Sequence, residues 1–242
     1  MIFDEFKKVF DFESKKMNII LDDLKMERFY KYMNLLLEWN EKINLTAITD
    51  EREIIVKHFL DSLTIEKYLD NIKNLADIGT GAGFPGIPIK IFNPNIKITL
   101  VDSLNKRVNF LNDIVKELKL ENVEVIHSRA EDLGKDKNYR EKFDVVTSRA
   151  VANMSILSEY LLPLVKIDGK CICMKGAEIE EELESAKYAI KLLGGRIEKV
   201  DNFELSDEHL KRNIVVIKKI DKSPSNYPRK AGIPAKKPIS RS

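Results

Sequence analysis

The sequence has few cysteines and histidines and only short apolar runs. Two cysteines and three histidines in 242 residues offer none of the usual ligand spacings of a metal site. No apolar run approaches the ~20 residues that a membrane-spanning helix needs. The chain also begins with acidic Asp4 and Glu5, where a secretory signal would be basic. These absences predict a cytoplasmic protein with no bound metal and no membrane partner.

The two cysteines, Cys171 and Cys173, are separated by one residue in a β-rich stretch. On a strand their side chains share a face but are poorly placed for a disulfide. The prediction is two core thiols, which are usually inert in apolar surroundings. The alternative is a nucleophilic cysteine of the kind that some base-modifying enzymes use.

Charge is distributed unevenly along the chain. Residues 211–242 hold ten Lys and Arg against one acid, a formal +9, so the overall +2 leaves −7 on residues 1–210. Such an end is either a solvated tail or an arm that contacts nucleic-acid phosphates. We predict the second role for Arg229, Lys230, Lys236 and Lys237. Four of the eight prolines also lie in the last nineteen residues, which indicates an extended segment.

Glycine and proline are absent from residues 1–70, a composition that favours helices. An apolar stripe with helical spacing follows Leu21-Asp22-Asp23, which supplies a capping residue, and it comprises Phe29, Tyr32, Leu36, Trp39 and Ile43. A second helix is expected from about Asp50 to Leu63. We therefore predict an N-terminal helical extension over residues 1–70.

From Asn74 onward, short β-rich runs alternate with helical patterns. The expected strands are Leu75–Gly79, Lys97–Asp102, Val123–His127, Phe143–Ser148, Lys170–Lys175, Arg196–Leu205 and Asn213–Ile220. The expected helices are Pro85–Phe92, Asn105–Leu118, Asn153–Val165 and Ile179–Leu193. This alternation predicts an α/β fold with a mostly parallel seven-stranded sheet. No helix separates the last two strands, so we expect an antiparallel hairpin at one edge of the sheet.

The predicted α/β domain spans residues 71–220, and a basic, proline-rich tail follows over 221–242.

A glycine-rich loop joins the first strand to its helix. Glycines at 79, 81, 83 and 86 allow a sharp turn and close approach of a ligand to the backbone. The spacing Gly81-x-Gly83-x-x-Gly86 also fits the dinucleotide fingerprint. The loop alone therefore leaves the ligand class open.

Acidic residues near the ends of the first three strands limit which class of ligand the glycine loop can bind. Asp77, two residues before Gly79, could accept from a cationic amino group but would repel a pyrophosphate. Asp102 ends the second strand, where a carboxylate can hold both ribose hydroxyls. Ala130 and Glu131 follow the third strand, beside the expected position of an adenine. A nucleoside with an ammonium-bearing tail and no phosphate fits all three, and we predict S-adenosylmethionine as the cofactor.

Several motifs in order resemble one family. They are Glu38-Trp-Asn-Glu-Lys-Ile-Asn-Leu-Thr46, His58-Phe-Leu-Asp-Ser62, Gly79-Thr-Gly-Ala-Gly-Phe-Pro-Gly-Ile-Pro88, Asp102-Ser103, Ser148-Arg-Ala150 and Arg229-Lys-Ala-Gly-Ile-Pro234. Together they are similar to the bacterial ribosomal RNA guanine-N7 methyltransferases of the RsmG, or glucose-inhibited division protein B, family. The likeness runs from Leu35 to Pro238 and leaves the first ~20 residues without a role.

This resemblance implies a Rossmann-like class I methyltransferase fold and a guanine in the 530 loop of 16S ribosomal RNA as the substrate. It also implies cofactor contacts from Gly79, Phe84, Ala130, Glu131 and Arg149, to which the loop analysis adds Asp77, Gly81 and Asp102. Arg149 could also stack on or hydrogen-bond the target base, and a purely structural salt bridge is the alternative. The partner would be the RNA or the small-subunit particle, and the protein is expected to be a monomer.

Guanine N7 carries an in-plane lone pair, so its methylation needs alignment rather than a general base. The chain accordingly has Ser148-Arg149-Ala150 where enzymes that methylate exocyclic amines carry an Asp/Asn-Pro-Pro-aromatic motif. Two alternatives stay open: a dinucleotide-dependent oxidoreductase and a non-enzymatic nucleotide-sensing regulator.

Overall fold

The computed structural model describes residues 1–205 and 209–241. Its centre is a seven-stranded sheet in the order β3-β2-β1-β4-β5-β7-β6. The strands are β1 (Asn74–Ile78), β2 (Lys97–Asp102), β3 (Val123–His127), β4 (Phe143–Arg149), β5 (Val165–Lys175), β6 (Gly195–Leu205) and β7 (Leu210–Lys219). β1 to β5 pair in parallel, whereas β7 is antiparallel to both β5 and β6. The predicted sheet and its edge hairpin are confirmed, although residues 206–208 of the predicted connection lie outside the described residues.

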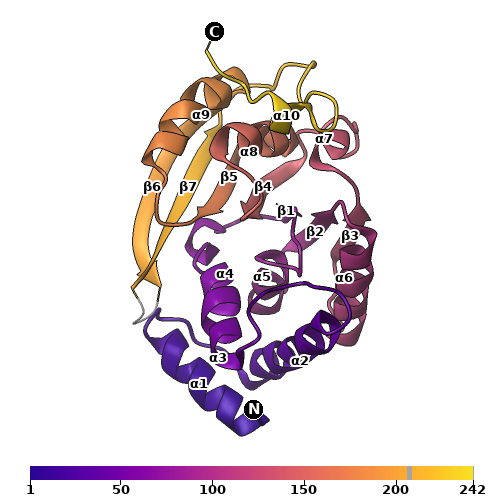
Figure 1. The fold of residues 1–242 in the computed structure, drawn as a ribbon, viewed down its shortest axis with the longest axis vertical. Coiled ribbons are helices and arrows are strands. Elements are labelled where there is room, and N and C mark those ends of the chain that lie inside the picture. Colours follow the sequence, from indigo (N-terminus) through magenta and orange to yellow (C-terminus); the bar gives the residue numbers. More distant parts are fainter. Residues whose placement is uncertain (206–208, 242) are drawn as a thin grey trace.

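Helices cover both faces of the sheet (Figure 1). One face carries α1 (Phe3–Lys15), α2 (Asp23–Asn40), α3 (Glu51–Ile54), α4 (Asp61–Leu63), α5 (Gly86–Phe92) and α6 (Asn105–Glu117). The other carries α7 (Ala130–Leu133), α8 (Met154–Leu161) and α9 (Glu180–Leu192), and α10 (Ile233–Lys236) packs on α8. The short elements are the π-helical turn η1 (Ile55–Leu60), η2 (Glu66–Tyr68) and η3 (Leu162–Leu164). The N-terminal helices thus share a core with the sheet.

The predicted N-terminal helices are present, with two differences. The side chains of Asp22 and Asp50 cap α2 and α3 by accepting the N–H groups of Lys25 and Glu53. α2 ends at Asn40, so Ile43 lies beyond the helix, although it packs against the same core as the rest of the predicted stripe. The cause is the Asn40 side chain, whose Oδ1 accepts the N–H groups of Leu45 and Thr46 and turns the chain. The second helix contains the π turn η1, a feature that often marks functional sites.

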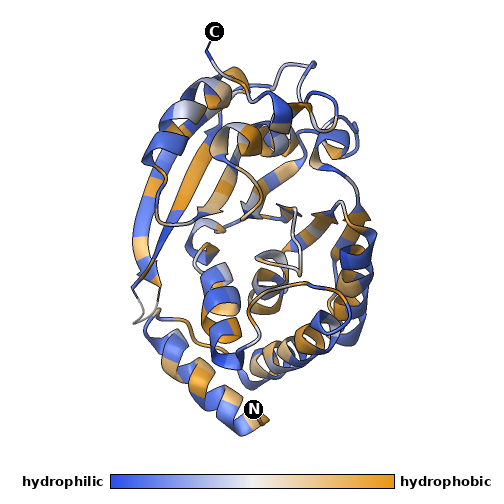
Figure 2. Cartoon of the chain, viewed as in Figure 1, coloured by the Kyte–Doolittle hydropathy of each residue, from blue (hydrophilic) through white to orange (hydrophobic). Residues whose placement is uncertain are grey.

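Two hydrophobic clusters fill the space on either side of the sheet. Alternate residues of β5 face opposite clusters: Cys171 and Cys173 point toward α8 and α9, and Ile172 and Met174 toward the N-terminal helices. Figure 2 shows that the inner strand β7 is largely hydrophobic whereas the edge strand β6 is largely hydrophilic. This pattern agrees with a central strand buried on both faces beside an edge strand exposed to solvent.

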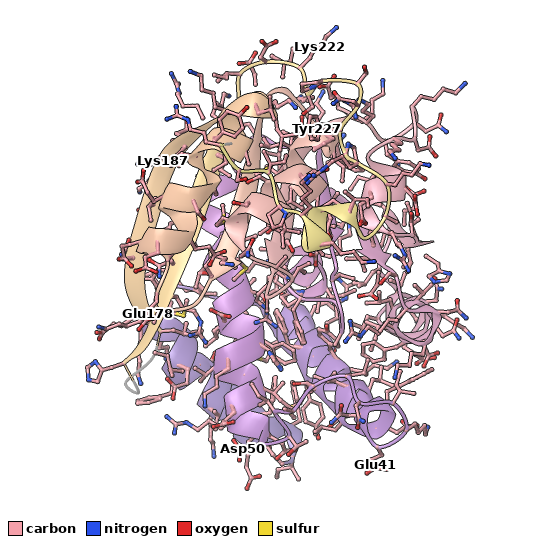
Figure 3. The ribbon with its side chains drawn as sticks, turned by 45° about the horizontal axis from the view of Figure 1, so that its top comes forward. Glu41, Asp50, Glu178, Lys187, Lys222 and Tyr227 are labelled. Carbon is pink, nitrogen blue, oxygen red and sulfur yellow. The ribbon has the colours of Figure 1, made fainter. Side chains whose placement is uncertain are left out.

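The C-terminal segment is packed on the domain, which corrects the predicted extended tail. Figure 3 shows it crossing the molecule, with Lys222 and Tyr227 on the chain that leads to α10. Arg140 fixes its start by donating to the carbonyl oxygens of Ser223 and Tyr227. Pro234 and Ile239 are buried further along. Proline prevents regular pairing here, but apolar burial and backbone contacts order the segment instead.

In the described part of the chain, no helix has both the length and the apolar character that crossing a bilayer requires.

Candidate functional site

Two adjacent cavities open at the carboxyl ends of the parallel strands, where ligands of open α/β sheets bind. The first, the glycine-loop cavity, has a volume of about 320 Å³. It is lined by Ile78, Gly79, Val101, Asp102, Ser103, Ser128, Arg129, Ala130, Glu131, Val151, Tyr160, Gly232 and Ala235. Four predicted cofactor residues, Gly79, Asp102, Ala130 and Glu131, therefore meet in one cavity.

The glycine loop is tied to the end of β2. Gly79 and Gly81 have φ of +67° and +63°, values that favour glycine. The Gly81 N–H donates to Asp102 Oδ2 at 3.0 Å, and Leu104 N–H donates to Oδ1 at 2.9 Å. A Cβ at Gly79 would lie 2.6 Å from Val151 Cγ2, so a side chain there would close the cavity. Asp102 thus shapes the loop as well as lining the cavity.

Asp77 lies beneath the glycine loop. Its side chain is fully buried, and Oδ2 accepts the Thr80 hydroxyl at 2.6 Å and the Gly86 N–H at 2.8 Å. Burial raises the pKa of Asp77 to about 6. The carboxylate is not among the residues that line the cavity, and it supports the loop from below; its contact with a ligand amino group stays a prediction. Oδ1 is buried without a hydrogen-bond partner in the described chain.

The C-terminal segment forms one wall of the glycine-loop cavity. Gly232 N–H donates to Glu131 Oε1 at 2.9 Å. Arg229 binds the buried carboxylate of Glu159 on α8 through its backbone N–H, Nε and Nη2, at 2.7, 3.0 and 2.6 Å. This ion pair holds the segment beside Tyr160, and it occupies the Arg229 guanidinium that was predicted to contact RNA.

The second cavity, the Arg149 cavity, has a volume of about 380 Å³ and lies at the ends of β4 and β5. It is lined by Ile48, Lys57, His58, Asp61, Arg149, Ala150, Met174, Lys175, Gly176, Phe203, Arg212, Asn213 and Ile214. Ala150 lines this cavity and Val151 the other, so these two residues separate the cavities. Ala150 has φ +56°, an uncommon backbone state for a residue with a Cβ that is often found at functional sites.

Arg149 connects β4 to the N-terminal helices. Nη1 donates to the carbonyl oxygen of Lys57 and to Asp61 Oδ2, both at 3.0 Å, and Nη2 lies 3.1 Å from His58 Nδ1. Asp61 Oδ1 accepts Arg212 Nε from β7 at 3.2 Å. One carboxylate therefore joins two arginines from different strands.

His58 is neutral in this arrangement. Burial and the Arg149 charge lower its pKa to about 3. Because arginine can only donate, Nδ1 accepts and Nε2 carries the proton, which it donates to Thr46 Oγ1 at 2.8 Å. The ring also stacks on Phe84, with centroids 4.5 Å apart. Both nitrogens of His58 are thus occupied, and it orients Arg149.

The predicted cofactor residues divide between three places. Gly79, Asp102, Ala130 and Glu131 line the glycine-loop cavity, and Gly81 is bound to Asp102. Asp77 lies beneath the loop. Phe84, 5% exposed, packs against His58 and lies 4.9 Å from the Arg149 guanidinium. Arg149 itself lines the neighbouring cavity.

Three residues of the site were not predicted from the sequence: Asp61 and Arg212, which line the Arg149 cavity, and Glu159, which holds Arg229. Asp61 lies within the quoted His58–Ser62 motif, so its spacing of three from His58 on a helix could have identified it. Arg212 and Glu159 carried no local signal, because their partners are distant in sequence. Exposed Lys230, Lys236 and Lys237 lie on or next to α10, close to the cavity wall, and their contact with RNA stays a prediction.

Neither cysteine is expected to take part in catalysis. Both are free and fully buried, and burial raises the pKa of Cys173 to about 12 and that of Cys171 well above its ordinary value. Replacing both by alanine should leave turnover within about a few-fold and cost ~1–3 kcal/mol of stability. Thermal unfolding and methyl-transfer assays check this. A folded but inactive double variant, together with a protein–RNA adduct that accumulates in one of the two single-cysteine variants, would restore the nucleophilic alternative.

Comparison with known proteins identifies the family. The family model described as GidB, rRNA small subunit methyltransferase G, matches residues 25–213. The chain belongs to this family. The ribosomal RNA small subunit methyltransferase G of Desulforamulus reducens is 55% identical over 229 residues, covering 94% of this chain and 95% of that protein. That of a Clostridium botulinum strain is 57% identical over 215 residues, covering 88% and 90%.

Solved structures agree on the fold. A SAM-dependent methyltransferase from Aquifex aeolicus has a TM-score of 0.50 at 18% identity, covering 68% of this chain and 92% of that one. TrmN from Thermus thermophilus has a TM-score of 0.52 at 13% identity, covering 69% and 53%. The predicted class I methyltransferase fold and the family resemblance are confirmed. The chain is a member of a ribosomal RNA methyltransferase family, and S-adenosylmethionine is the cofactor that family and fold imply.

Proposed function

We propose that this protein methylates N7 of a guanine in the 530 loop of 16S ribosomal RNA, by direct transfer from S-adenosylmethionine without a general base. The observation that carries this proposal is the pair of cavities that adjoin at Ala150 and Val151. One has the loop and acidic strand end suited to an adenosine-bearing cofactor. The other has the size of a small-molecule site and holds its acid–base groups in fixed ion pairs and hydrogen bonds.

The residues of the glycine-loop cavity fit this cofactor. Gly79 leaves the loop open above β1. The buried Asp102 carboxylate accepts two backbone N–H groups and, at 3.5 Å, the Arg107 guanidinium, and it retains acceptor capacity for a ribose hydroxyl. Ala130 and Glu131 border the adenine side. When bound, the cofactor supplies an electrophilic methyl group on a sulfonium, and the C–S bonding electrons stay on sulfur.

The Arg149 cavity suits an acceptor that needs no proton removed. His58 has both ring nitrogens engaged and a pKa of about 3, and Asp61 is bound by two arginines. Neither is arranged as a general base. Guanine N7 offers its lone pair directly, so the task of these residues is to hold the base in line with the methyl group, a proximity effect.

Methyl transfer to defined RNA tests the proposal. The purified protein is given labelled S-adenosylmethionine with unmodified 16S RNA, free or in small-subunit particles, and N7-methylguanine is mapped by borohydride reduction and aniline cleavage. Label at one guanine of the 530 loop is the expected result, and comparing the two substrates shows which form is used. A nucleotide-sensing regulator would transfer nothing, and label on another atom would refute the N7 assignment.

Asp102→Ala is expected to weaken S-adenosylmethionine binding about 30-fold or more, because losing two hydrogen bonds to a charged acceptor costs roughly 2–4 kcal/mol. Isothermal titration calorimetry measures the affinity. Asp132→Ala is the matched control, since Asp132 is an exposed acid on α7. Near-native affinity in folded Asp102→Ala would refute the ribose role.

A further inference from the structure

Asp61 is the acidic side chain among the residues that line the Arg149 cavity. Its side chain is only 5% exposed, and each carboxylate oxygen accepts from one arginine, Oδ2 from Arg149 and Oδ1 from Arg212. An ionised carboxylate has about four acceptor sites. Two of them therefore remain for a ligand, in a group that two strands hold in place.

The rest of the cavity suits a flat, partly apolar ligand. Ile48, Met174, Phe203 and Ile214 supply apolar walls around the Asp61–Arg149 pair. A site of this kind, with a few fixed polar groups in an apolar lining, obtains its specificity from the polar groups.

We infer that Asp61 selects guanine by accepting hydrogen bonds from its N1–H and its N2 amino group. The inference rests on the proposed N7 methylation and adds the group that recognises the base. Guanine is the purine with two adjacent donors on this edge, whereas adenine presents a lone pair at N1 that a carboxylate repels. Recognition of the six-membered ring also leaves N7, on the five-membered ring, free to react.

The same contact assists the reaction itself. Methylation at N7 turns a neutral guanine into a cation, since the N7 lone pair becomes the new bond and no proton leaves. A carboxylate at N1–H stabilises the charge as it develops, in a cavity otherwise bordered by Lys57, Arg149, Lys175 and Arg212. Asp61 thereby favours the transition state over the bound substrate.

The test uses RNA in which inosine, which lacks the N2 amino group, replaces the target guanine. Wild-type protein should show a kcat/KM for guanine RNA about tenfold to a hundredfold above that for inosine RNA, because inosine keeps N1–H and loses one hydrogen bond to a charged acceptor. Asp61→Asn should lose activity mainly on guanine RNA, so that the preference falls to about threefold or less. Comparing the two ratios removes the intrinsic reactivity difference between the bases. Cofactor affinity should not change.

Two results would overturn the inference. One is equal kcat/KM of the wild type on both RNAs, which needs no variant to fold. The other is an equal loss on both RNAs in folded Asp61→Asn, which would mean that Asp61 acts only by holding Arg149. Failure of the proposed function is seen separately, because the wild type would then place no methyl group on guanine N7.

Discussion

Replacing Arg149 by methionine is expected to lower kcat/KM for methyl transfer about 100- to 1,000-fold. The guanidinium binds Asp61, His58 and the Lys57 carbonyl from one position. Removing one partner of a buried ion pair typically costs about 3–5 kcal/mol. We expect this cost to appear as slower methyl transfer, because the target base is aligned less well, and as lower stability of the folded protein. Single-turnover methyl transfer at saturating cofactor measures the first, and thermal unfolding the second.

The affinity of Arg149→Met for S-adenosylmethionine shows whether Arg149 contacts the cofactor or acts only in the Arg149 cavity. Arg149 lines the Arg149 cavity and not the glycine-loop cavity. We therefore expect the affinity for S-adenosylmethionine to stay within about threefold of the wild-type value, because a residue that does not contact the cofactor contributes little to its binding. A parallel loss of cofactor binding would instead support the cofactor contact that the family resemblance implies. Arg196→Met on β6 is the matched control, because Arg196 is exposed. Near-native transfer by folded Arg149→Met would refute its positioning role.

The parts of the fold that the sequence predicted are those with local causes. The capped start of α2, the bounds of β2 and β3, and the sharp turn of the glycine loop follow from neighbouring residues. The alternation of strands and helices then limits the topology to a few arrangements. The helix predicted over Asn153–Val165 is shorter, because Pro163 cannot donate an N–H and the chain passes through η3 into β5.

Of the residues of the candidate site, only those that lie at or directly after the end of a strand could be predicted from the sequence. Asp102, Ala130 and Glu131 follow their strands directly, so their convergence follows from a parallel sheet. The network of Asp61 with Arg149 and Arg212 joins residues 88 and 151 positions apart. No local sequence pattern predicts these ion pairs, because they form only when η1 and α4 pack against the sheet.

The roles of the charged residues in the C-terminal segment could not be predicted from the sequence either. Composition alone gives +9 over residues 211–242, yet three of those charges are used inside the domain, one of them Arg212 in its ion pair with Asp61. Lys219 is fully buried and donates to Leu162 O and Ser223 Oγ at 2.7 and 2.5 Å, and Arg229 pairs with Glu159. A count of charges cannot separate those that build the domain from those that reach solvent.

Deleting residues 228–242 is expected to weaken S-adenosylmethionine binding about tenfold to a hundredfold. The charge distribution by itself predicts a loss of RNA binding, with packing of the Arg229–Pro234 turn over the cofactor pocket as the alternative. The structure favours the alternative, because Gly232 and Ala235 line the glycine-loop cavity. The deletion also leaves the Glu159 carboxylate buried without Arg229, and an uncompensated buried charge costs about 3–5 kcal/mol. Calorimetry on the truncated protein, with its unfolding temperature measured alongside, gives the size of the effect.

A charge variant separates the two roles of the segment. Lys236→Gln with Lys237→Gln keeps Arg229, Gly232 and Pro234 in place, so cofactor affinity should stay within about twofold. If both lysines contact phosphates, the salt slope of RNA binding should fall by roughly 1.4–1.8, because each phosphate contact contributes about 0.7–0.9 to that slope. An unchanged slope would remove these lysines from the RNA interface. Unchanged cofactor binding after deletion of residues 228–242 would show that the wall formed by Gly232 and Ala235 does not contribute to the cofactor site.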